Sequence, residues 1–254
     1  YTGRGRKDAE PRLVGRCGSH TSARALHGRH PGRGVSFFLS SCTRTGATIQ
    51  VIQGETRPVI GALALQGDFA AHSTTMEHLG AAVRPVRKVT QLEGLDGLII
   101  PGGESTTLIK LMDVFDFWEP LKHWIDEGHP VFGTCAGAIL LAEEVRGPAQ
   151  KSFGLIDITV ERNSYGRQVD SFEGRGRFRG TSQDSEEIDM IFIRAPRIIR
   201  VGTNVEALGD CRGDVVVARQ DHVLVSTFHP ELGSGSSIHE YFLQMVVATR
   251  SSGP

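Results

Sequence analysis

The sequence predicts an α/β fold in which helices cover both faces of a mostly parallel sheet. From Pro58 onward, short apolar runs alternate with helix-like segments. The runs are apolar at almost every position, which is typical of strands buried on both faces of a parallel sheet. The second half of the chain is richer in strands and hairpin-like turns, so we expect antiparallel strands to extend this sheet.

The elements can be placed in order along the chain. In the first half, apolar runs that end in small or turn-forming residues predict strands within 59–67, 81–88, 95–103 and 129–135. The segments between them predict helices over 70–81 and 105–128, the second as one helix or two, and a further helix directly after Cys135. The second half predicts strands within 154–168, 190–202 and 213–231, and a last helix over 237–249.

Composition excludes some classes of protein. The 254 residues suit one sizeable domain or two small ones, and a formal net charge of −1 argues against a nucleic-acid binder with a basic surface. No apolar run approaches the roughly 18 residues needed to span a bilayer. Four cysteines show neither a Cys-x-x-Cys pair nor zinc spacing, which indicates a reducing, cytoplasmic setting.

The first part of the chain differs from the rest. Residues 1–57 contain ten Lys or Arg against three acids, many Gly and Ser, and no sustained periodicity. Such a composition predicts a basic leader that is disordered in isolation, followed by one domain over 58–250. A targeting segment and an extension that is not native to the protein are the alternatives for this leader.

Residues 129–142, HPVFGTCAGAILLA, place Cys135 between a strand-like and a helix-like run. A Gly-x-Cys-x-Gly spacing suits a sharp strand-to-helix turn, because side chains at the flanking positions would collide where the backbone folds back. The turn exposes the central side chain, and the N–H groups that begin the helix favour its thiolate. Cys135 is therefore a candidate nucleophile. The alternative is a buried cysteine that fills a gap between strand and helix.

A second loop, PGGES at residues 101–105, follows the strand LDGLII. The carboxyl ends of parallel strands meet at one edge of the sheet, so we expect this loop to lie near Cys135. Its glycines let backbone N–H groups face a ligand, and the next residues can begin a helix with capping hydroxyls. The N–H groups of Gly103 and Ala136 would together form an oxyanion hole. The alternative is a purely structural turn.

A candidate base follows the apolar run VLVSTF. His229 and Glu231 stand two residues apart in HPE, and Pro230 favours an extended backbone at the residue before it. In an extended segment, side chains two apart point the same way. The Glu231 carboxylate would then orient the imidazole of His229, which would take the proton from Cys135.

Six segments along the chain are distinctive in their order and approximate spacing, namely LALQGDFAAH, PGGESTTL, GTCAGAILLA, ERNSYGRQVDSFE, FIRAP and TFHPEL. In these segments the chain resembles the PdxT-type (SNO) glutaminase subunits of pyridoxal 5′-phosphate synthase, a family of class I glutamine amidotransferases. The resemblance runs from about Val59 to Val247, roughly three quarters of the chain. Many class I amidotransferases share G-x-C-x-G and HPE, whereas PGGEST, RNSYGRQ and FIRAP are specific to this branch.

The resemblance implies a flavodoxin-like, three-layer α/β/α fold and a glutaminase with a Cys135, His229 and Glu231 triad. It also implies L-glutamine as substrate, no cofactor or metal, and a separate PdxS-type synthase subunit that receives the ammonia. Residue by residue, the substrate contacts implied are Gly103, Glu104, Ser105, Arg162, Ile193 and Arg194. Taken by itself, Arg162 also suits a surface salt bridge. The acidic stretch 179–190 is expected to be a slightly long loop.

Three rival functions remain open on the sequence. One is another class I amidotransferase, or a related thiol hydrolase that acts on γ-glutamyl bonds. Another is a catalytically silent subunit that only stabilises a complex. A dinucleotide-binding module is disfavoured, because no G-x-G-x-x-G follows the first strand.

Overall fold

The structure is a computed structural model that describes residues 56–162, 171–180 and 184–252. The predicted leader, apart from its last two residues, lies outside the described residues. The same is true of most of the RNSYGRQ segment.

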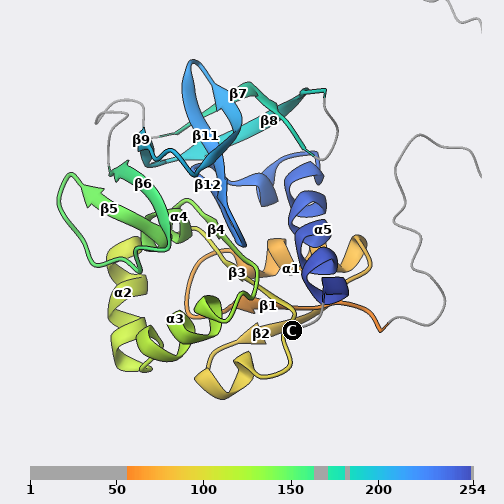
Figure 1. The fold of residues 1–254 in the computed structure, drawn as a ribbon. Helices are drawn as coiled ribbons and strands as arrows, with labels where there is room; N and C mark the ends of the chain where they lie inside the picture. Colours follow the sequence, from red (N-terminus) through yellow and green to blue (C-terminus); the bar gives the residue numbers. More distant parts are fainter. Residues whose placement is uncertain (1–55, 163–170, 181–183, 253–254) are drawn as a thin grey trace, which may run out of the picture. The chain divides into compact units, whose positions relative to one another are not determined.

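A nine-stranded sheet forms the centre of the described domain, in the order β2-β1-β3-β4-β12-β11-β10-β7-β8 (Figure 1). Its strands, in chain order, are β1 (Val59–Leu63), β2 (Ala82–Val86), β3 (Gly97–Ile100), β4 (Val131–Thr134), β7 (Ser171–Phe178), β8 (Glu186–Ile193), β10 (Glu206–Cys211), β11 (Asp214–Gln220) and β12 (Val223–Ser226). The first five strands of the sheet order pair in parallel, and the remaining pairs are antiparallel. The predicted parallel sheet with added antiparallel strands is confirmed.

Helices cover both faces of this sheet. One face packs against α1 (Phe69–His78) and α5 (Ser237–Ser252), and the other against α2 (Ser105–Val114), α3 (Trp118–Asp126) and α4 (Ala136–Leu141) (Figure 1). Side chains alternate along each strand. In β3, Leu98 and Ile100 join the core beneath α2 and α3, whereas Ile99 joins the core beneath α1 and α5. The three-layer arrangement follows from strands that are apolar on both faces.

The predicted helical segment 105–128 forms two helices. After α2, Asp116 adopts a left-handed backbone with φ 53°, and the N–H of Phe117 donates to the carbonyl of Met112 at 2.9 Å. This bond satisfies a carbonyl that the end of the helix leaves free. Phe117 is fully buried, so it anchors the turn from which α3 starts.

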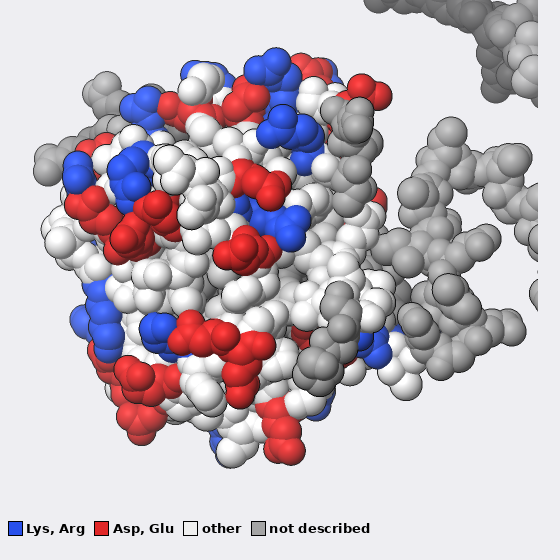
Figure 2. Space-filling model, viewed as in Figure 1, with Lys and Arg blue, Asp and Glu red and all other residues white. Residues whose placement is uncertain are grey.

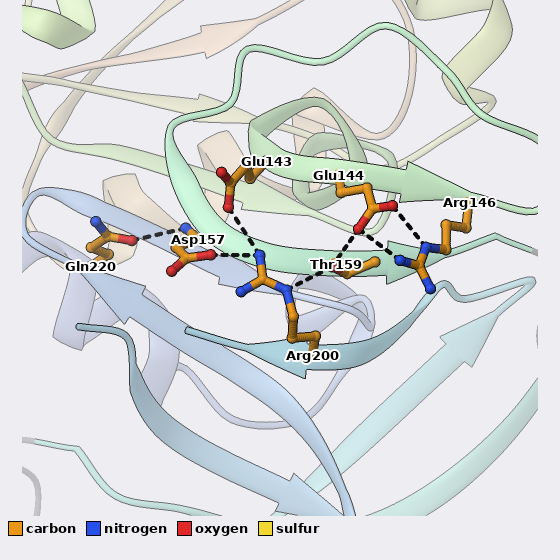
Figure 3. Close-up of polar contacts among 7 residues, drawn as sticks. All are labelled: Glu143, Glu144, Arg146, Asp157, Thr159, Arg200 and Gln220. Atoms are coloured by element: carbon orange, nitrogen blue, oxygen red, sulfur yellow. Dashed lines mark hydrogen bonds and ion pairs between the residues drawn. The ribbon is translucent and has the colours of Figure 1, made fainter. Parts of the chain in front are cut away.

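A smaller sheet lies beside the first and consists of β5 (Ala142–Arg146), β6 (Ile156–Glu161) and β9 (Arg197–Val201), in the order β5-β6-β9. Arg200 of β9 links its strands, because its guanidinium contacts Glu143 at 2.9 Å, Asp157 at 2.5 Å and Thr159 at 3.0 Å (Figure 3). The network continues through Glu144 and Arg146, and Gln220 of β11 joins it to the large sheet. Arg162 directly follows β6 of this sheet, and Arg194 lies in the short connection from β8 of the large sheet to β9, so the smaller sheet adjoins two predicted site residues.

The expectation of a long acidic loop over 179–190 is wrong for its last five residues. Residues from Glu186 belong to β8, which pairs in antiparallel register with β7. Arg175 of β7 lies 3.1 Å from Glu187 and 3.6 Å from Asp189, so cross-strand ion pairs accommodate the acidic side chains.

Two short 3-10 helices complete the elements, η1 (Val89–Leu92) and η2 (Pro230–Leu232). None of the helices within the described ranges has the length and apolar character needed to cross a membrane. Basic and acidic side chains are interspersed on the face of the molecule that Figure 2 shows.

Candidate functional site

Cys135 occupies the turn between β4 and α4. Its backbone has φ 47° and ψ −99°, a conformation that side-chain-bearing residues rarely adopt and that occurs where the surroundings hold a residue in place. Its N–H donates to the carbonyl of Ser226 at 2.8 Å, and its own carbonyl accepts from Ile139 at 3.2 Å. The turn is thus fixed to β12 on one side and to α4 on the other.

The two glycines that flank Cys135 are required by close packing. A Cβ atom added to Gly133 would lie 2.6 Å from the carbonyl carbon of Gly137, and one added to Gly137 would collide with the carbonyl oxygen of Ile100. The structure therefore confirms the steric argument made from the G-x-C-x-G spacing.

His229 and Glu231 form a hydrogen-bonded pair. Nδ1 of His229 lies 2.8 Å from Oε1 of Glu231, and both residues are buried. The expected extended backbone is wrong, because Glu231 belongs to the 3-10 helix η2. Pro230 fits the first position of η2, where no N–H is needed. The turn, not an extended strand, places the carboxylate against the ring.

The imidazole of His229 lies next to Cys135, with Gly102 packed against both. A Cβ atom on Gly102 would lie 3.2 Å from Cβ of Cys135 and 3.1 Å from Nδ1 of His229, so this position has no room for a side chain. Burial by itself would lower the pKa of His229. Hydrogen bonds and charge interactions with Cys135 and Glu231 outweigh burial and raise this pKa to about 10. The site therefore favours an imidazolium at neutral pH.

A cavity of about 150 Å³ opens beside Cys135. It is lined by Gly103, Glu104, Ser105, Cys135, Ile139, Arg162, Ile193, Arg194, Pro196 and His229. All six predicted substrate contacts are among these residues. Ala136, predicted for the oxyanion hole, follows Cys135 as the first residue of α4 but does not line the cavity. The carbonyl of Ile193 lies 3.9 Å from Sγ of Cys135.

Charged groups of both signs stand around the cavity. Glu104 caps α2, accepting from the hydroxyl of Thr106 at 2.6 Å and from its N–H at 3.2 Å. The Thr106 hydroxyl is the main cause of the lowered pKa of Glu104. Arg162 lies 3.9 Å from Glu104, and its side chain is only 12% exposed. This site can receive a small molecule that carries both a carboxylate and an ammonium group.

Sequence reasoning missed several polar residues around the site. Oε1 of Gln66 accepts from the N–H of Glu104 at 3.2 Å and packs against Gly103. His72, Thr134 and His239 form a buried polar cluster behind Glu231. The available signal was a histidine in each of two helices that pack on the apolar sheet, but which of the ten histidines lie together depends on the tertiary structure.

Comparison with known proteins shows the family to which the chain belongs. The SNO glutamine amidotransferase family matches residues 62–248, which is well over half of the chain. The chain belongs to the SNO glutamine amidotransferase family. The PdxT-type resemblance found from the sequence segments is therefore confirmed.

Individual members of the SNO family are similar over most of the described domain. The pyridoxal 5′-phosphate synthase subunit PdxT of Thermosipho africanus is 52% identical over 187 residues, which are 74% of this chain and 98% of that protein. The subunit of the same name from Corynebacterium jeikeium is 49% identical over 191 residues, 74% of this chain and 96% of that protein.

A solved structure described as a glutamine amidotransferase superposes with a TM-score of 0.69 and 44% identity. The match covers 74% of this chain and 98% of that structure. A protein from Thermoplasma acidophilum, described as a putative GMP synthase subunit, shares the fold with a TM-score of 0.59 at 17% identity. The flavodoxin-like fold expected for this SNO family member is confirmed.

Proposed function

We propose that the chain hydrolyses L-glutamine to L-glutamate and ammonia as the glutaminase subunit of a pyridoxal 5′-phosphate synthase. The observation that carries the proposal is Cys135, held on a strained turn beside the His229 and Glu231 pair at the wall of a cavity. Membership of the SNO family and the similarity to PdxT subunits support it.

In this proposal the thiolate of Cys135 attacks the carboxamide carbon of glutamine. The resulting oxyanion accepts from the N–H groups of Gly103 and Ala136. The imidazolium of His229 gives its proton to the departing nitrogen, so ammonia leaves and a γ-glutamyl thioester remains. Neutral His229 then takes a proton from water, which attacks the thioester, and the proton returns to sulfur as glutamate departs. Glu231 keeps the ring oriented through both steps.

The charged groups at the cavity suit the amino-acid end of glutamine. Arg162 would pair with the α-carboxylate, because a guanidinium can donate to both of its oxygens. Glu104 would accept from the α-ammonium, and its low pKa keeps it ionised. Ile193 and Arg194 would close the cavity over the side chain, and Ser105 would line its opposite wall.

We further propose that a PdxS-type synthase subunit docks over the loops at the carboxyl ends of β1 and β3 and receives the ammonia. Near pH 7 free ammonia is mostly protonated and unreactive, so a closed path preserves the product. A Cβ atom on Gly67 would collide with the carbonyl oxygen of Gly102, so these two loops already touch. Docking would reorient the peptide at Gly103 and complete the oxyanion hole. On the cysteine usage alone, we place the reaction in the cytoplasm.

The test is glutamate release by the purified full chain, alone and titrated with a synthase subunit. A saturable rise is expected, because misplaced oxyanion donors can hold activity down by about 10² to 10³. A flat response with complex formation confirmed would reject activation by docking. Absence of glutamate under all conditions, with Cys135 unreactive toward a glutamine-like electrophile, would instead indicate a silent subunit.

A further inference from the structure

A pair of buried histidines continues the polar network behind Glu231. His72 of α1 and His239 of α5 are both fully buried, and Nδ1 of His72 lies 2.9 Å from Nε2 of His239. The other nitrogen of His72, Nε2, lies 3.2 Å from the hydroxyl of Thr134 and 3.3 Å from Oε2 of Glu231. The proposed catalytic steps use neither histidine.

Both rings are neutral at physiological pH. Burial lowers the pKa of His72 well below its ordinary value, and the neighbouring His239 and His229 lower it further. Burial also lowers the pKa of His239, to about 4. Among the residues that the structure describes, the only carboxylate in contact with either ring is that of Glu231, which also contacts His229.

The pairing of the Glu231 carboxylate with the imidazolium of His229 settles which nitrogens of these rings carry hydrogen. A carboxylate can only accept, so Nε2 of His72 must carry the hydrogen that faces Glu231 and Thr134. In a neutral ring Nδ1 of His72 is then an acceptor, and Nε2 of His239 must donate to it. The donors therefore run in one direction, from α5 through α1 to Glu231.

The outer oxygen of Glu231 depends on this arrangement. Within the described part of the chain, Oε2 is buried and makes no well-aligned hydrogen bond, and the 3.3 Å contact with His72 is an off-axis one. A buried carboxylate oxygen is costly to leave without a donor. Nε2 of His72 lies 3.3 Å from this oxygen, whereas Oε1 is engaged by His229.

We propose that His72 is a positioning residue for the triad. Supported by His239 and Thr134, its Nε2–H holds the Glu231 carboxylate so that Oε1 faces Nδ1 of His229. The carboxylate thus lies between two imidazoles that have different tasks. His229 exchanges protons with the substrate, while His72 remains neutral and fixes the orientation.

Two other roles for the cluster fit the structure less well. The described residues contain no group of three or more His, Cys, Asp or Glu side chains placed to hold a metal ion. A packing role alone would not require donors that run in one direction toward a carboxylate, and an apolar side chain of similar size would fill the same space.

The test compares His72→Gln, which keeps an N–H near the position of Nε2, with His72→Leu, which fills the space without a donor. We expect His72→Leu to lower kcat by about 2- to 150-fold, the range of coupling between residues in contact, with KM almost unchanged. His72→Gln should retain more activity than His72→Leu. If packing were the only role, His72→Leu would be the more active variant, and that result would overturn the proposal.

A double-mutant cycle with Glu231→Gln shows whether His72 acts through Glu231. In the Glu231→Gln background, His72→Leu should have little further effect, whereas equal effects in both backgrounds would contradict the proposal. His78→Gln on the exposed end of the same helix is the matched control and should leave kcat unchanged. Met76→Ala is the stability control, because it weakens the same buried face without touching Glu231.

The inference rests on the proposed glutaminase activity, so a second measurement does not use glutamine. Alkylation of Cys135 by iodoacetamide, followed across pH by peptide mass spectrometry, reports the thiolate directly. His72→Leu should move this profile toward higher pH, because a misplaced Glu231 stabilises the imidazolium of His229 less well, and His72→Gln should move it less. If His72→Leu does not fold, Thr134→Val, which removes one support of His72, should move the profile the same way. An unmoved profile in a folded His72→Leu or Thr134→Val protein would overturn the positioning role, whatever the substrate proves to be.

Discussion

Nδ1 of His229 lies 2.8 Å from Oε1 of Glu231 because a 3-10 turn, not an extended strand, separates the two residues. The turn buries the carboxylate beneath the imidazole and leaves its second oxygen facing His72 of α1. One local change of backbone direction therefore brings Glu231 against His229 within the proposed triad.

Replacement of Cys135 by Ala should abolish glutamate release, by at least about 10³-fold, because none of the other described residues that line the cavity carries a thiol. The melting temperature should change little, since the replacement removes one sulfur atom at a cavity wall. Cys211→Ala is the control, as its thiol is buried away from the cavity, and it should retain activity. Turnover by pure Cys135→Ala protein would place the nucleophile elsewhere.

His229→Asn should lower kcat by about 10² to 10⁴, the usual contribution of a general acid and base. Glu231→Gln should have a smaller effect, because the imidazole stays in place but loses the carboxylate that stabilises its charged form. Steady-state kinetics on both variants provide the measurement. A larger loss for Glu231→Gln than for His229→Asn would contradict the assigned roles.

Gly137→Ala should lower the free energy of unfolding by about 1 to 3 kcal/mol, the usual cost of forcing extra atoms into a packed site. The added Cβ would collide with the carbonyl oxygen of Ile100 in the neighbouring strand β3. Urea denaturation measures the change. Gly235→Ala, where no atom lies within 4 Å of the added carbon, is the control and should unfold as the parent does.

Stability should fall as the pH drops below about 6.5. An unfolded histidine binds a proton near pH 6.5, whereas folded His239 resists protonation until about pH 4. The unfolded state thus binds more protons in this window, and each such histidine lowers the free energy of unfolding by about 1.4 kcal/mol per pH unit. His239→Gln should flatten the profile between pH 6.5 and 4, measured by urea denaturation at each pH. An unchanged slope would show that His239 is charged in the folded state.

The spacing around Cys135 and the apolar runs before it were sufficient to predict this turn, because they act over a few residues. The two glycines that flank Cys135 are recognisable because a sharp turn leaves no room for side chains at these positions. The apolar strands are recognisable because a strand that is apolar throughout must be covered on both faces. The substrate contacts Glu104, Ser105, Arg162, Ile193 and Arg194 came from the family resemblance of their segments. The structure brings them to one cavity.

Other features were decided only by contacts between distant parts of the chain. His72 and His239 are 167 residues apart, so no local pattern shows that they share a hydrogen bond behind Glu231. The sequence of the acidic residues in β8 predicts a loop, because it does not show that Arg175 on the neighbouring strand forms ion pairs with them. The α2–α3 break depends on Asp116 in a backbone conformation usually taken by glycine. Steric constraints on a turn act between neighbouring residues, so the sequence alone predicts them. The surroundings of a buried polar group are set by elements that pack around it from distant parts of the chain, so only the tertiary structure shows them.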